Sequence, residues 1–524
     1  LGDVYKRQII DMCWEYNLAG HDLRHSGRFC MILKELISEL DYTLYNGNEN
    51  VEITELVCDS RKIVKGCLFV CVRGTVFDGH TFIDEAIRQG AAAIITEEKV
   101  EITENRKNTA FVAAEDCRNT LAMVSAAYFG HPAKELFTIG ITGTKGKTTT
   151  AFMVRGILER CGYKTGLIGT IEIITGARHI ESANTTPESY DVQRYFREMV
   201  DNGCKCVVME VSSQALMMKR CAGITFDIGV FTNLEPDHIG PNEHASFEDY
   251  MHCKGLLFKQ CRTGIVNFDD EHTAQVLEGH TCAVETYGLN EGAGLRAVNI
   301  QYVHEPGHIS TEYDIAGEKL HIRLSLPGKF SVYNSLCAVA VTRHLDVDDE
   351  KLKEALLTVA VKGRVEPVRV SDKFILMIDY AHNAMSLKSI LETLREYNPK
   401  RLVSVFGCGG NRSKLRRYEM GEVSGKLADF TIITSDNPRY EEPLDIIADI
   451  RSSIEKTGGE FIEIPDRKEA IRYAIENGRE GDIIVLAGKG HEDYQEIKGV
   501  KYPMDERVLI KEVLEELKCG SQIS

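Results

Sequence analysis

A short run of glycine, lysine and threonine residues carries the clearest chemical signal in this sequence. The run, at positions 143–149, follows the apolar stretch "LFTIGIT" and precedes the helical pattern "AFMVRGILERC". Glycines let backbone N–H groups wrap around phosphate oxygens at a helix N-terminus, while Lys147 can reach the terminal phosphates and Thr148 can ligate Mg²⁺. Ile141 stands where the strict G-x-x-x-x-G-K-[ST] pattern requires glycine, so this is the shorter T-G-T-x-G-K-T form. The strand–loop–helix context predicts ATP binding.

Several charged side chains stand where apolar runs end, which is where open parallel sheets place their ligands. Glu210 ends "CVVME", Asp379 follows "FILMI", and His238 lies in "NLEPDH" after a further apolar run. A glutamate that follows four apolar residues is expected to be functional rather than simply solvated. Lys254, in "EDYMHCKGLLF", has by its spacing alone the pattern of an ordinary surface lysine on an amphipathic helix.

The composition indicates a globular protein with several domains. The 524 residues exceed the ~250–300 at which one hydrophobic core stops growing. A formal net charge of −17 argues against nucleic-acid or anionic-membrane partners, because such a field repels polyanions. No apolar run is long enough to predict a membrane-spanning helix. The 16 cysteines form no four-ligand C-x-x-C array, so we expect reduced thiols in a cytoplasmic protein.

Three regions of alternating strand-like and helix-like segments follow one another along the chain. Residues 1–30 have no clear period, and we interpret them as a non-native or extension segment that contributes nothing to the fold; a helical pattern starts at "MILKELISEL". The first region covers residues 31–134. The second, 135–361, contains the continuous apolar runs of a parallel sheet buried on both faces. The third, 362–524, repeats a strand-then-polar-loop unit four times. We predict an α/β protein with a central P-loop ATPase-like parallel sheet and a C-terminal Rossmann-like domain.

The order of the motifs resembles that of the Mur ligases, ATP-dependent amide-forming enzymes of peptidoglycan synthesis. The phosphate loop is shared with folylpolyglutamate and cyanophycin synthetases and is only moderately specific. The chain adds "DSRKIVKGCLFVCVRGTVFDGHTFIDEAIRQGA", which looks like the uridine-nucleotide domain of the family's third-residue-adding enzyme. It then carries that enzyme's motifs in order: "NTTPES", "MEVSSQAL", "VKGRVEPV", "IDYAHN", "GCGGNR", "SDNPR" and "GKGHEDYQ".

The resemblance implies a three-domain Mur ligase architecture: a UDP-sugar-binding domain at 31–134, an ATP-binding ligase domain at 135–361 and an amino-acid-binding domain at 362–524. It implies ATP and Mg²⁺ as cofactors and UDP-N-acetylmuramoyl-L-alanyl-D-glutamate as the acceptor. The SDNPR motif points to meso-diaminopimelate as the added amino acid. We expect a monomer without nucleic-acid or membrane partners.

The resemblance also assigns roles to residues. It implies that the chemistry depends on Lys147, Lys254, Glu210 and His238, and that Mg²⁺ is held by Thr148, Glu210, His238 and a carbamylated Lys254. The implied ATP site is Gly143, Thr144, Lys145, Gly146, Lys147, Thr148, Thr149, Asn334 at the adenine, Arg364 at phosphate and Asp379 at the ribose. The implied acceptor site is Ser60, Arg61, Thr185, Thr186, Ser212 and Arg220. The implied diaminopimelate site is Arg412, Asp436, Asn437, Pro438, Arg439, Gly488 and Glu492.

Some features of these assignments depend on chemistry or depart from the family pattern. Arg412 and Arg439 can clamp carboxylates with paired N–H donors, and Glu492 can accept from an ammonium group. For Arg61 a simple surface ion pair is the alternative. After His238 the chain reads I-G-P where the family usually continues L-D-Y-H, which changes the loop that carries the histidine.

Three alternative functions stay open at this point. The same ligase could use L-lysine, although a residue other than Arg439 is then expected. A folylpolyglutamate-synthetase-like ligase would have its phosphate loop near the start of the chain, whereas residues 31–134 precede it here. A non-catalytic nucleotide-binding regulator should have lost Lys147, Glu210 or Lys254, and all three are present.

Overall fold

The computed structural model of this protein describes residues 31–74, 77–237, 239–240 and 243–521. The described chain forms two compact units. The first comprises the residues up to Thr144 together with Tyr163–Gly264 and His272–Val284, and the second comprises Lys145–Gly162, Ile265–Glu271 and the chain from Glu285 onward. Residues 1–30, interpreted above as a non-native or extension segment, lie outside the described residues. Within the described ranges, no helix has both the length and the apolar character that crossing a membrane requires, and no disulfide joins any of their cysteines.

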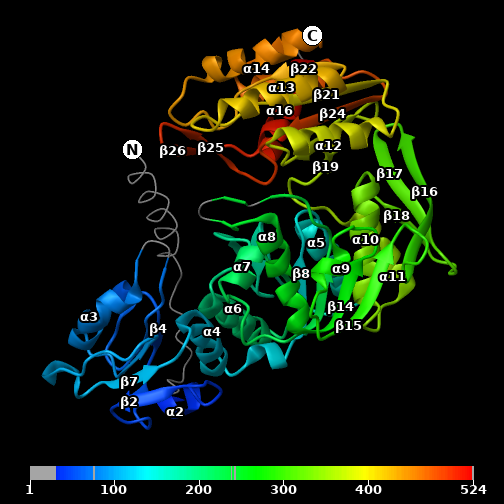
Figure 1. Ribbon diagram of the computed structural model, residues 1–524. Helices are drawn as coiled ribbons and strands as arrows, with labels where there is room; N and C mark the ends of the chain where they lie inside the picture. Colours follow the sequence, from blue (N-terminus) through cyan, green and yellow to red (C-terminus); the bar gives the residue numbers. More distant parts are fainter. Residues whose placement is uncertain (1–30, 75–76, 238, 241–242, 522–524) are drawn as a thin grey trace. The chain divides into compact units, whose positions relative to one another are not determined.

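The first unit contains a five-stranded sheet near the start of the chain (Figure 1). Its parallel strands are β4 (Leu56–Val57), β5 (Leu68–Val70), β6 (Ala93–Thr96) and β7 (Ala110–Ala113), and β2 (Thr43–Asn46) pairs with β7 antiparallel. Helix α4 (Cys117–Tyr128) belongs to the hydrophobic cluster on one face, and α3 (Ile83–Arg88) to that on the other.

The helical pattern that begins at Met31 gives a helix of only four residues, α2 (Leu33–Leu36). The two residues before it pair as β1 (Met31–Ile32) with β3 (Glu52–Ile53), so the chain is extended there. Leu33, Leu36 and Ile37 are nevertheless all buried. The apolar spacing therefore predicted correctly that these three side chains are buried, but the helix that it indicated is much shorter than expected.

A parallel sheet forms the centre of the first unit, as the apolar runs predicted. Strands β9 (Thr165–Ile168), β12 (Cys206–Glu210), β8 (Phe137–Thr142) and β13 (Phe226–Phe231) are parallel neighbours in that order. Strands β10 (Glu172–Ile174) and β11 (His179–Glu181) extend the β9 edge antiparallel. The same unit contains α6 (Ser189–Asp201), α7 (Ser213–Met217) and α8 (Phe247–Gly255). Because the four strands are parallel, the residues after Thr142 and Glu210 emerge at one edge of the sheet.

The second unit begins with the helix that follows the phosphate loop. This helix, α5 (Lys147–Arg160), packs against α10 (Lys329–Thr342) and α11 (Asp349–Thr358). Three antiparallel strands precede α10, namely β16 (Leu295–Glu305), β17 (His308–Ile315) and β18 (His321–Leu324).

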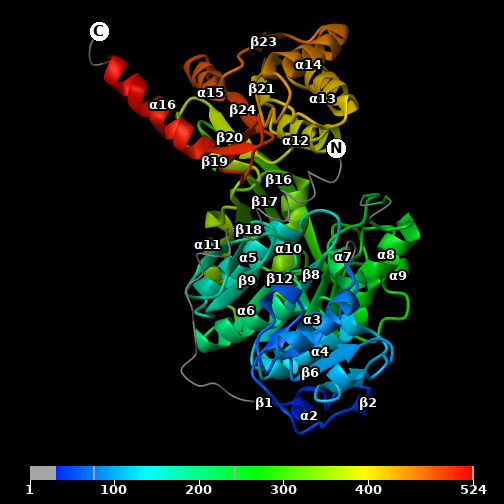
Figure 2. The same cartoon turned by 90° about the vertical axis from the view of Figure 1, so that its left-hand side faces the viewer.

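A second parallel sheet occupies the C-terminal part of the chain. Its order is β19 (Glu366–Val368), β20 (Ile375–Asp379), β24 (Asp482–Ala487), β21 (Arg401–Phe406), β22 (Phe430–Ile433) and β23 (Phe461–Glu463), with only β19 antiparallel. Helices α12 (Ala384–Arg395), α13 (Lys414–Leu427) and α14 (Pro443–Thr457) cover one face, and α15 (Arg467–Glu476) and α16 (Glu506–Ser521) the other (Figure 2). A hairpin of β25 (Tyr494–Ile497) and β26 (Val500–Pro503) follows β24. The doubly wound α/β class is confirmed, whereas the boundaries at residues 134 and 361 stay predictions.

Candidate functional site

The phosphate loop joins the carboxyl end of β8 to the N-terminus of α5. Gly143 and Gly146 have φ values of +145° and +84°, which favour glycine. Neither has room for a side chain: a Cβ on Gly143 would lie 1.9 Å from the Thr232 hydroxyl oxygen, and a Cβ on Gly146 would lie 2.5 Å from Asn334 Oδ1. Helix α5 begins at Lys147, so this lysine stands where the helix dipole favours an anion. Glycine is therefore required at both positions, as expected for a phosphate-binding loop, while the contacts of the loop with phosphate stay a prediction.

Asn334, which was expected at the adenine, is buried on α10 beside this loop. The Thr150 hydroxyl donates a hydrogen bond to Asn334 Oδ1 over 3.3 Å. The asparagine therefore braces the first turn of α5. Its contact with adenine stays a prediction, as do the nucleotide contacts of Thr144, Lys145 and Thr149.

Lys254 is a buried lysine, not the surface lysine that its spacing alone indicates. It is 1 % exposed, and its Nζ donates to the Gly143 carbonyl oxygen over 2.9 Å. The same Nζ lies 4.3 Å from the centre of the Tyr250 ring. The Tyr250 hydroxyl shares a hydrogen bond of 3.1 Å with Thr144 Oγ1, and burial raises the pKa of Tyr250 to about 12. Helix α8 thus contacts the phosphate loop directly through Lys254 and Tyr250.

Glu210 is the last residue of β12 and is 1 % exposed. Its Oε1 accepts a hydrogen bond from the Thr170 backbone N–H over 2.9 Å, and its Oε2 accepts one from the Thr170 hydroxyl over 3.1 Å. A Cβ on Gly169 would lie 2.4 Å from Glu210 Oε1. Thr170 therefore fixes the direction of the carboxylate, and Gly169 leaves the space in which it lies.

Four residues of the predicted acceptor site meet around Glu210. The Thr186 hydroxyl donates to the Glu210 carbonyl oxygen over 2.8 Å and accepts from the Ser212 N–H over 3.1 Å. Arg220 donates through Nη1 to the Thr186 carbonyl oxygen over 3.1 Å. Thr185 shares a 3.0 Å hydrogen bond with the threonine that holds Glu210. The structure thus brings the hydroxyls and the guanidinium together, while their contact with a substrate stays a prediction.

The other two acceptor residues lie on a short 3-10 turn. Ser60 is half-buried, and the guanidinium of Arg61 donates through Nε and Nη2 to the Asp59 carboxylate, each over 3.0 Å. The surface ion pair considered for Arg61 is therefore present, and its contact with a uridine nucleotide stays a prediction. His238 lies outside the described residues, so its role also stays a prediction.

Asp379 is the buried last residue of β20. It accepts hydrogen bonds from the N–H groups of Val365 and Ala381 over 2.8 and 2.9 Å. Burial raises the pKa of Asp379, and Arg364 and the two N–H groups oppose that rise. The guanidinium of Arg364 lies 5.1 Å from the centre of the Tyr380 ring. Asp379 and Arg364 therefore lie at one sheet edge, as expected for neighbouring parts of a nucleotide site.

His491 packs on the same tyrosine. The ring centres of His491 and Tyr380 are 4.7 Å apart, and Nδ1 of His491 is buried with no hydrogen-bond partner among the described residues. Burial, together with Arg364, Lys362 and Arg507, lowers the pKa of His491 to about 4. The imidazole is therefore neutral at pH 7.

The loops of the predicted diaminopimelate site converge because β24, β21 and β22 are neighbours. Asn437 Nδ2 donates to Glu492 Oε2 over 3.0 Å. Arg439 donates through Nη1 to the Gly410 carbonyl oxygen over 2.8 Å and through Nε to Glu496 Oε2 over 2.9 Å. Arg439 is therefore already paired with a carboxylate, which the sequence did not reveal.

The remaining members of that set differ in their surroundings. Arg412 is exposed and forms no hydrogen bond or ion pair with any residue that the structure describes. Asp436 Oδ1 is buried without a hydrogen-bond partner among those residues and lies 3.6 Å from Lys489 Nζ. Gly488 has a φ of +112°, and a Cβ there would lie 3.2 Å from Asp436 Oδ2. Pro438 turns its carbonyl oxygen against the "GCGGN" loop. Whether these residues bind diaminopimelate stays a prediction.

Sequence reasoning missed four residues that hold the predicted ones in place: Thr170, Tyr250, Lys489 and Glu496. Lys489 and Glu496 follow the last of the four repeated strands, so a signal existed for them in "GKGHEDYQEI". No spacing in the sequence relates Thr170 to Glu210, or Tyr250 to the phosphate loop.

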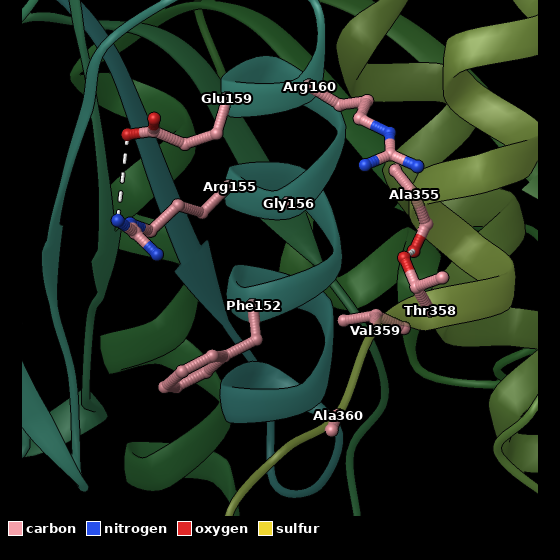
Figure 3. Close-up of a pocket in the computed structure, with 9 residues that line it drawn as sticks. All are labelled: Phe152, Arg155, Gly156, Glu159, Arg160, Ala355, Thr358, Val359 and Ala360. Atoms are coloured by element: carbon pink, nitrogen blue, oxygen red, sulfur yellow. Dashed lines mark hydrogen bonds and ion pairs between the residues drawn. The ribbon is translucent and has the colours of Figure 1, made fainter.

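A cavity of about 430 Å³ lies between α5 and α11 but contains none of these residues. Figure 3 shows Arg155 and Glu159 joined on one side of α5, and Arg160 directed toward α11. Arg155 pairs with Glu159 over 3.5 Å, and Arg160 with Glu354 over 2.9 Å. The lining is Phe152, Arg155, Gly156, Glu159, Arg160, Ala355, Thr358, Val359 and Ala360. The candidate site is therefore defined by the strand-end loops, not by this cavity.

Comparison with known proteins places three family domains along the chain. Residues 52–130 match the Mur ligase family catalytic domain, residues 141–342 the Mur ligase middle domain, and residues 363–490 the Mur ligase glutamate ligase domain. Two similar curated proteins are named UDP-N-acetylmuramoyl-L-alanyl-D-glutamate–2,6-diaminopimelate ligase. The one from Caldanaerobacter subterraneus subsp. tengcongensis is 42 % identical over 487 residues, which is 93 % of this chain and 99 % of that protein. The one from Clostridium perfringens is 41 % identical over 493 residues, covering 93 % of this chain and all of that protein.

Solved structures are also similar to this chain. A UDP-N-acetylmuramoyl-L-alanyl-D-glutamate–2,6-diaminopimelate ligase structure aligns with a TM-score of 0.72 and 26 % identity, covering 94 % of this chain and all of that one. A folylpolyglutamate synthase from Mycobacterium tuberculosis aligns with a TM-score of 0.54 and 16 % identity over 71 % of this chain, which is a likeness of fold alone. The three matched domains and the relatives, covered over nearly their whole length, show that the chain belongs to the Mur ligase family.

Proposed function

We propose that this protein uses ATP to join meso-diaminopimelate to UDP-N-acetylmuramoyl-L-alanyl-D-glutamate, a step of peptidoglycan precursor synthesis. The relatives that share about two-fifths of its residues carry the name of this activity. The observation that carries the proposal is the convergence of Arg412, Asn437, Arg439 and Glu492 at one edge of the C-terminal sheet. Guanidinium, amide and carboxylate groups together suit an amino-acid end that has both an ammonium and a carboxylate.

The reaction needs a leaving group on the acceptor carboxylate, because a carboxylate does not react with an amine at neutral pH. Transfer of the γ-phosphoryl group of ATP to the carboxylate oxygen releases ADP and gives an acyl phosphate. The amine of diaminopimelate then attacks the carbonyl carbon, loses its proton, and the tetrahedral intermediate collapses to an amide and inorganic phosphate. Catalysis of such steps is mostly positioning and charge stabilisation.

In this scheme the phosphate loop holds ATP. Lys147 and the N-terminus of α5 face the phosphates, Asp379 and Asn334 face the nucleoside, and Arg364 faces a phosphate. The hydroxyls of Thr185, Thr186 and Ser212, with Arg220, bind the dipeptide end of the acceptor, while Ser60 and Arg61 bind its nucleotide.

Mg²⁺ would be held by Thr148, Glu210, His238 and Lys254 and would supply charge neutralisation for the phosphates. Hydroxyl and carboxylate oxygens suit this cation, and the Glu210 carboxylate is fixed by Thr170. Lys254 as an ammonium cannot ligate a cation, whereas its carbamate offers oxygens. A carbamate would keep an N–H for the Gly143 carbonyl oxygen, to which the buried Nζ donates, so the modification is compatible with this hydrogen bond. We further propose that the enzyme acts as a cytoplasmic monomer.

The test is single-turnover formation of ADP and phosphate with the muramoyl dipeptide and one amino acid at a time. Product identity is read by mass spectrometry. We expect turnover with meso-diaminopimelate and little with L-lysine, because a site that pairs a substrate group can reject an analogue lacking it by ~10⁴-fold. Lys147→Ala should abolish ADP formation. Equal use of L-lysine would refute the specificity but not the ligase activity, and turnover only with a folate acceptor would refute both.

The specificity rests on the arginines, so Arg439→Ala should raise KM for diaminopimelate and lower its preference over L-lysine. ATP binding should be unchanged, because Lys147 and Asp379 lie in other loops. Arg369→Ala is the matched control, since Arg369 pairs with Asp372 on the exposed surface of the same C-terminal part. An equal change in both variants would contradict the assignment.

A further inference from the structure

A fully buried lysine lies at the centre of the proposed amino-acid site. Lys489 is 0 % exposed. Its Nζ donates to Glu492 Oε2 over 2.9 Å, to Asn437 Oδ1 over 3.0 Å and to the Tyr494 carbonyl oxygen over 2.5 Å. It also lies 3.6 Å from Asp436 Oδ1. Three residues of the proposed site are therefore organised around one ammonium group.

We propose that Lys489 is a positioning and specificity-determining residue, which fixes the amide of Asn437 and sets the net charge of the amino-acid site. The site would then select an amino-acid end that carries one ammonium and one carboxylate. This inference rests on the proposed function, because it concerns the amino acid which that function consumes.

Hydrogen bonds on both sides of the Asn437 amide fix its orientation. Oδ1 of Asn437 accepts from Lys489 Nζ and from the Glu496 N–H over 2.9 Å, while Nδ2 donates to Glu492 Oε2. An amide can turn over and exchange its oxygen and nitrogen, and donors facing the oxygen together with an acceptor facing the nitrogen prevent this. Lys489 is one of the two donors, and the only one that also binds Glu492. Its loss would remove one of the two donors to Asn437 Oδ1 and one of the two donors to Glu492 Oε2.

The formal charges of the cluster are paired only in part. Asp436 and Glu492 carry two negative charges, and Lys489 cancels one of them. Arg439 is cancelled by Glu496, with which it pairs over 2.9 Å. Arg412 has no carboxylate partner within the described part of the chain.

The cluster therefore keeps one excess negative charge and one excess positive charge. The negative charge is next to Asp436 Oδ1, a buried acceptor without a hydrogen-bond partner in the described ranges. Buried acceptors of this kind are rare and costly unless a donor arrives. An ammonium there and a carboxylate at Arg412 would complete the cluster, which is the pattern of the distal end of diaminopimelate. L-lysine offers only the ammonium.

A purely structural role for Lys489 is the competing explanation, since removing one partner of a buried ion pair destabilises most proteins. The same strand provides a matched control at its other end. Asp482, the first residue of β24, is 1 % exposed and pairs with Arg401 over 2.6 Å. It lies at the amino end of the strand, and Lys489 lies just beyond the carboxyl end.

The experiment compares wild type with Lys489→Met, Lys489→Gln and Asp482→Asn, using KM for each substrate and the thermal midpoint. For Lys489→Met we expect KM for diaminopimelate to rise at least tenfold, KM values for ATP and the muramoyl dipeptide to stay within twofold, and the preference over L-lysine to fall. Lys489→Gln keeps a donor for Asn437 without the charge. Its KM for diaminopimelate should therefore rise less than that of Lys489→Met, whereas its preference for diaminopimelate over L-lysine should fall as much. Asp482→Asn should lower the thermal midpoint and leave both amino-acid readouts unchanged.

Several results would overturn the inference. These are an unchanged KM for diaminopimelate in folded Lys489→Met, an equal rise in KM for all three substrates, or the same amino-acid effect in Asp482→Asn. Failure of both Lys489 variants to fold, while Asp482→Asn folds, would assign the lysine a structural role only.

The proposed function can fail separately. If wild type uses L-lysine, the substrate assignment is wrong. The role of Lys489 is then tested by comparing KM for L-lysine between wild type and the Lys489 variants. If wild type ligates no amino acid, the inference is decided by a crystal structure of Lys489→Met at pH 7. Unmoved side chains of Asn437 and Glu492 would then refute it.

Discussion

Protonation of His491 is expected to cost stability in mildly acidic solution. Burial, with Arg364, Lys362 and Arg507, lowers its pKa from 6.5 to about 4 in the folded protein. As the pH falls, the unfolded chain therefore takes up the proton first, so folding loses stability from pH 6.5 down to about pH 4 and no further below. Linkage makes the full loss about 3 kcal/mol and the loss at pH 5 about 2 kcal/mol. The stability contribution is complete above pH 6.5.

Two measurements test this expectation. The imidazole pKa can be read by NMR of ¹³C-labelled histidine, with the His491→Gln variant identifying the resonance. The second is the denaturation midpoint at pH 7 and pH 5, where His491→Gln should lose less stability than wild type. His179→Gln is the control, because His179 is 67 % exposed at its side chain. The His179→Gln variant should lose as much stability between pH 7 and pH 5 as wild type does.

The reasoning would be refuted by a His491 resonance that titrates near pH 6.5 in the folded protein. It would equally be refuted by wild type and His491→Gln losing the same stability between pH 7 and pH 5. Either result would mean that the imidazole is solvated or that a proton acceptor meets its Nδ1.

Three further predictions concern buried groups. Gly169→Ala should lower kcat about 100-fold, because the new Cβ displaces Glu210 from its hydrogen bonds; this corresponds to about 3 kcal/mol on the barrier. Gly156→Ala is the control, since its new Cβ meets nothing closer than 3.9 Å. It should keep activity and stabilise α5 by up to about 1 kcal/mol. Glu506→Gln leaves the 3 % exposed Arg467 without its carboxylate and should cost about 3–5 kcal/mol in chemical denaturation; an unchanged midpoint would contradict this. Lys254→Ala should stay folded and lose most ligase activity. Mass spectrometry of wild type under gentle conditions should reveal the carbamate. A fully active enzyme with an unmodified Lys254 would disprove this prediction.

The parts of the site that local sequence specifies could be predicted. Glycine is required at 143 and 146 because the backbone there has positive φ and no room for a Cβ. Glu210 and Asp379 end buried strands, as the apolar runs indicated. These features are set by neighbours along the chain, so a single sequence contains them.

The parts set by distant neighbours could not be predicted in this way. Lys254 has the spacing of a surface residue, yet it is buried because α8 packs on a loop 111 residues earlier. Thr170 holds Glu210 from 40 residues away. In both cases the interaction partner can be identified only once the strand order is known. The residue types next to the lysine or the glutamate in the sequence do not indicate which residue that partner is.

The same limit applies most sharply to Arg439, the residue that was expected to meet the extra carboxylate of diaminopimelate. A guanidinium in a tight loop reads as an available positive charge, but Glu496, 57 residues later, already neutralises it through Nε. Arg439 also holds the Gly410 carbonyl oxygen, so the loop direction is fixed before any substrate arrives. Such a group still offers directed N–H donors, but it adds no net charge to the site. That charge must come from Arg412, which is exposed and has no ion-pair partner in the described part of the chain. Sequence motifs thus identify the groups that can recognise a substrate, whereas the charge they present depends on the partners that the fold gives each of them.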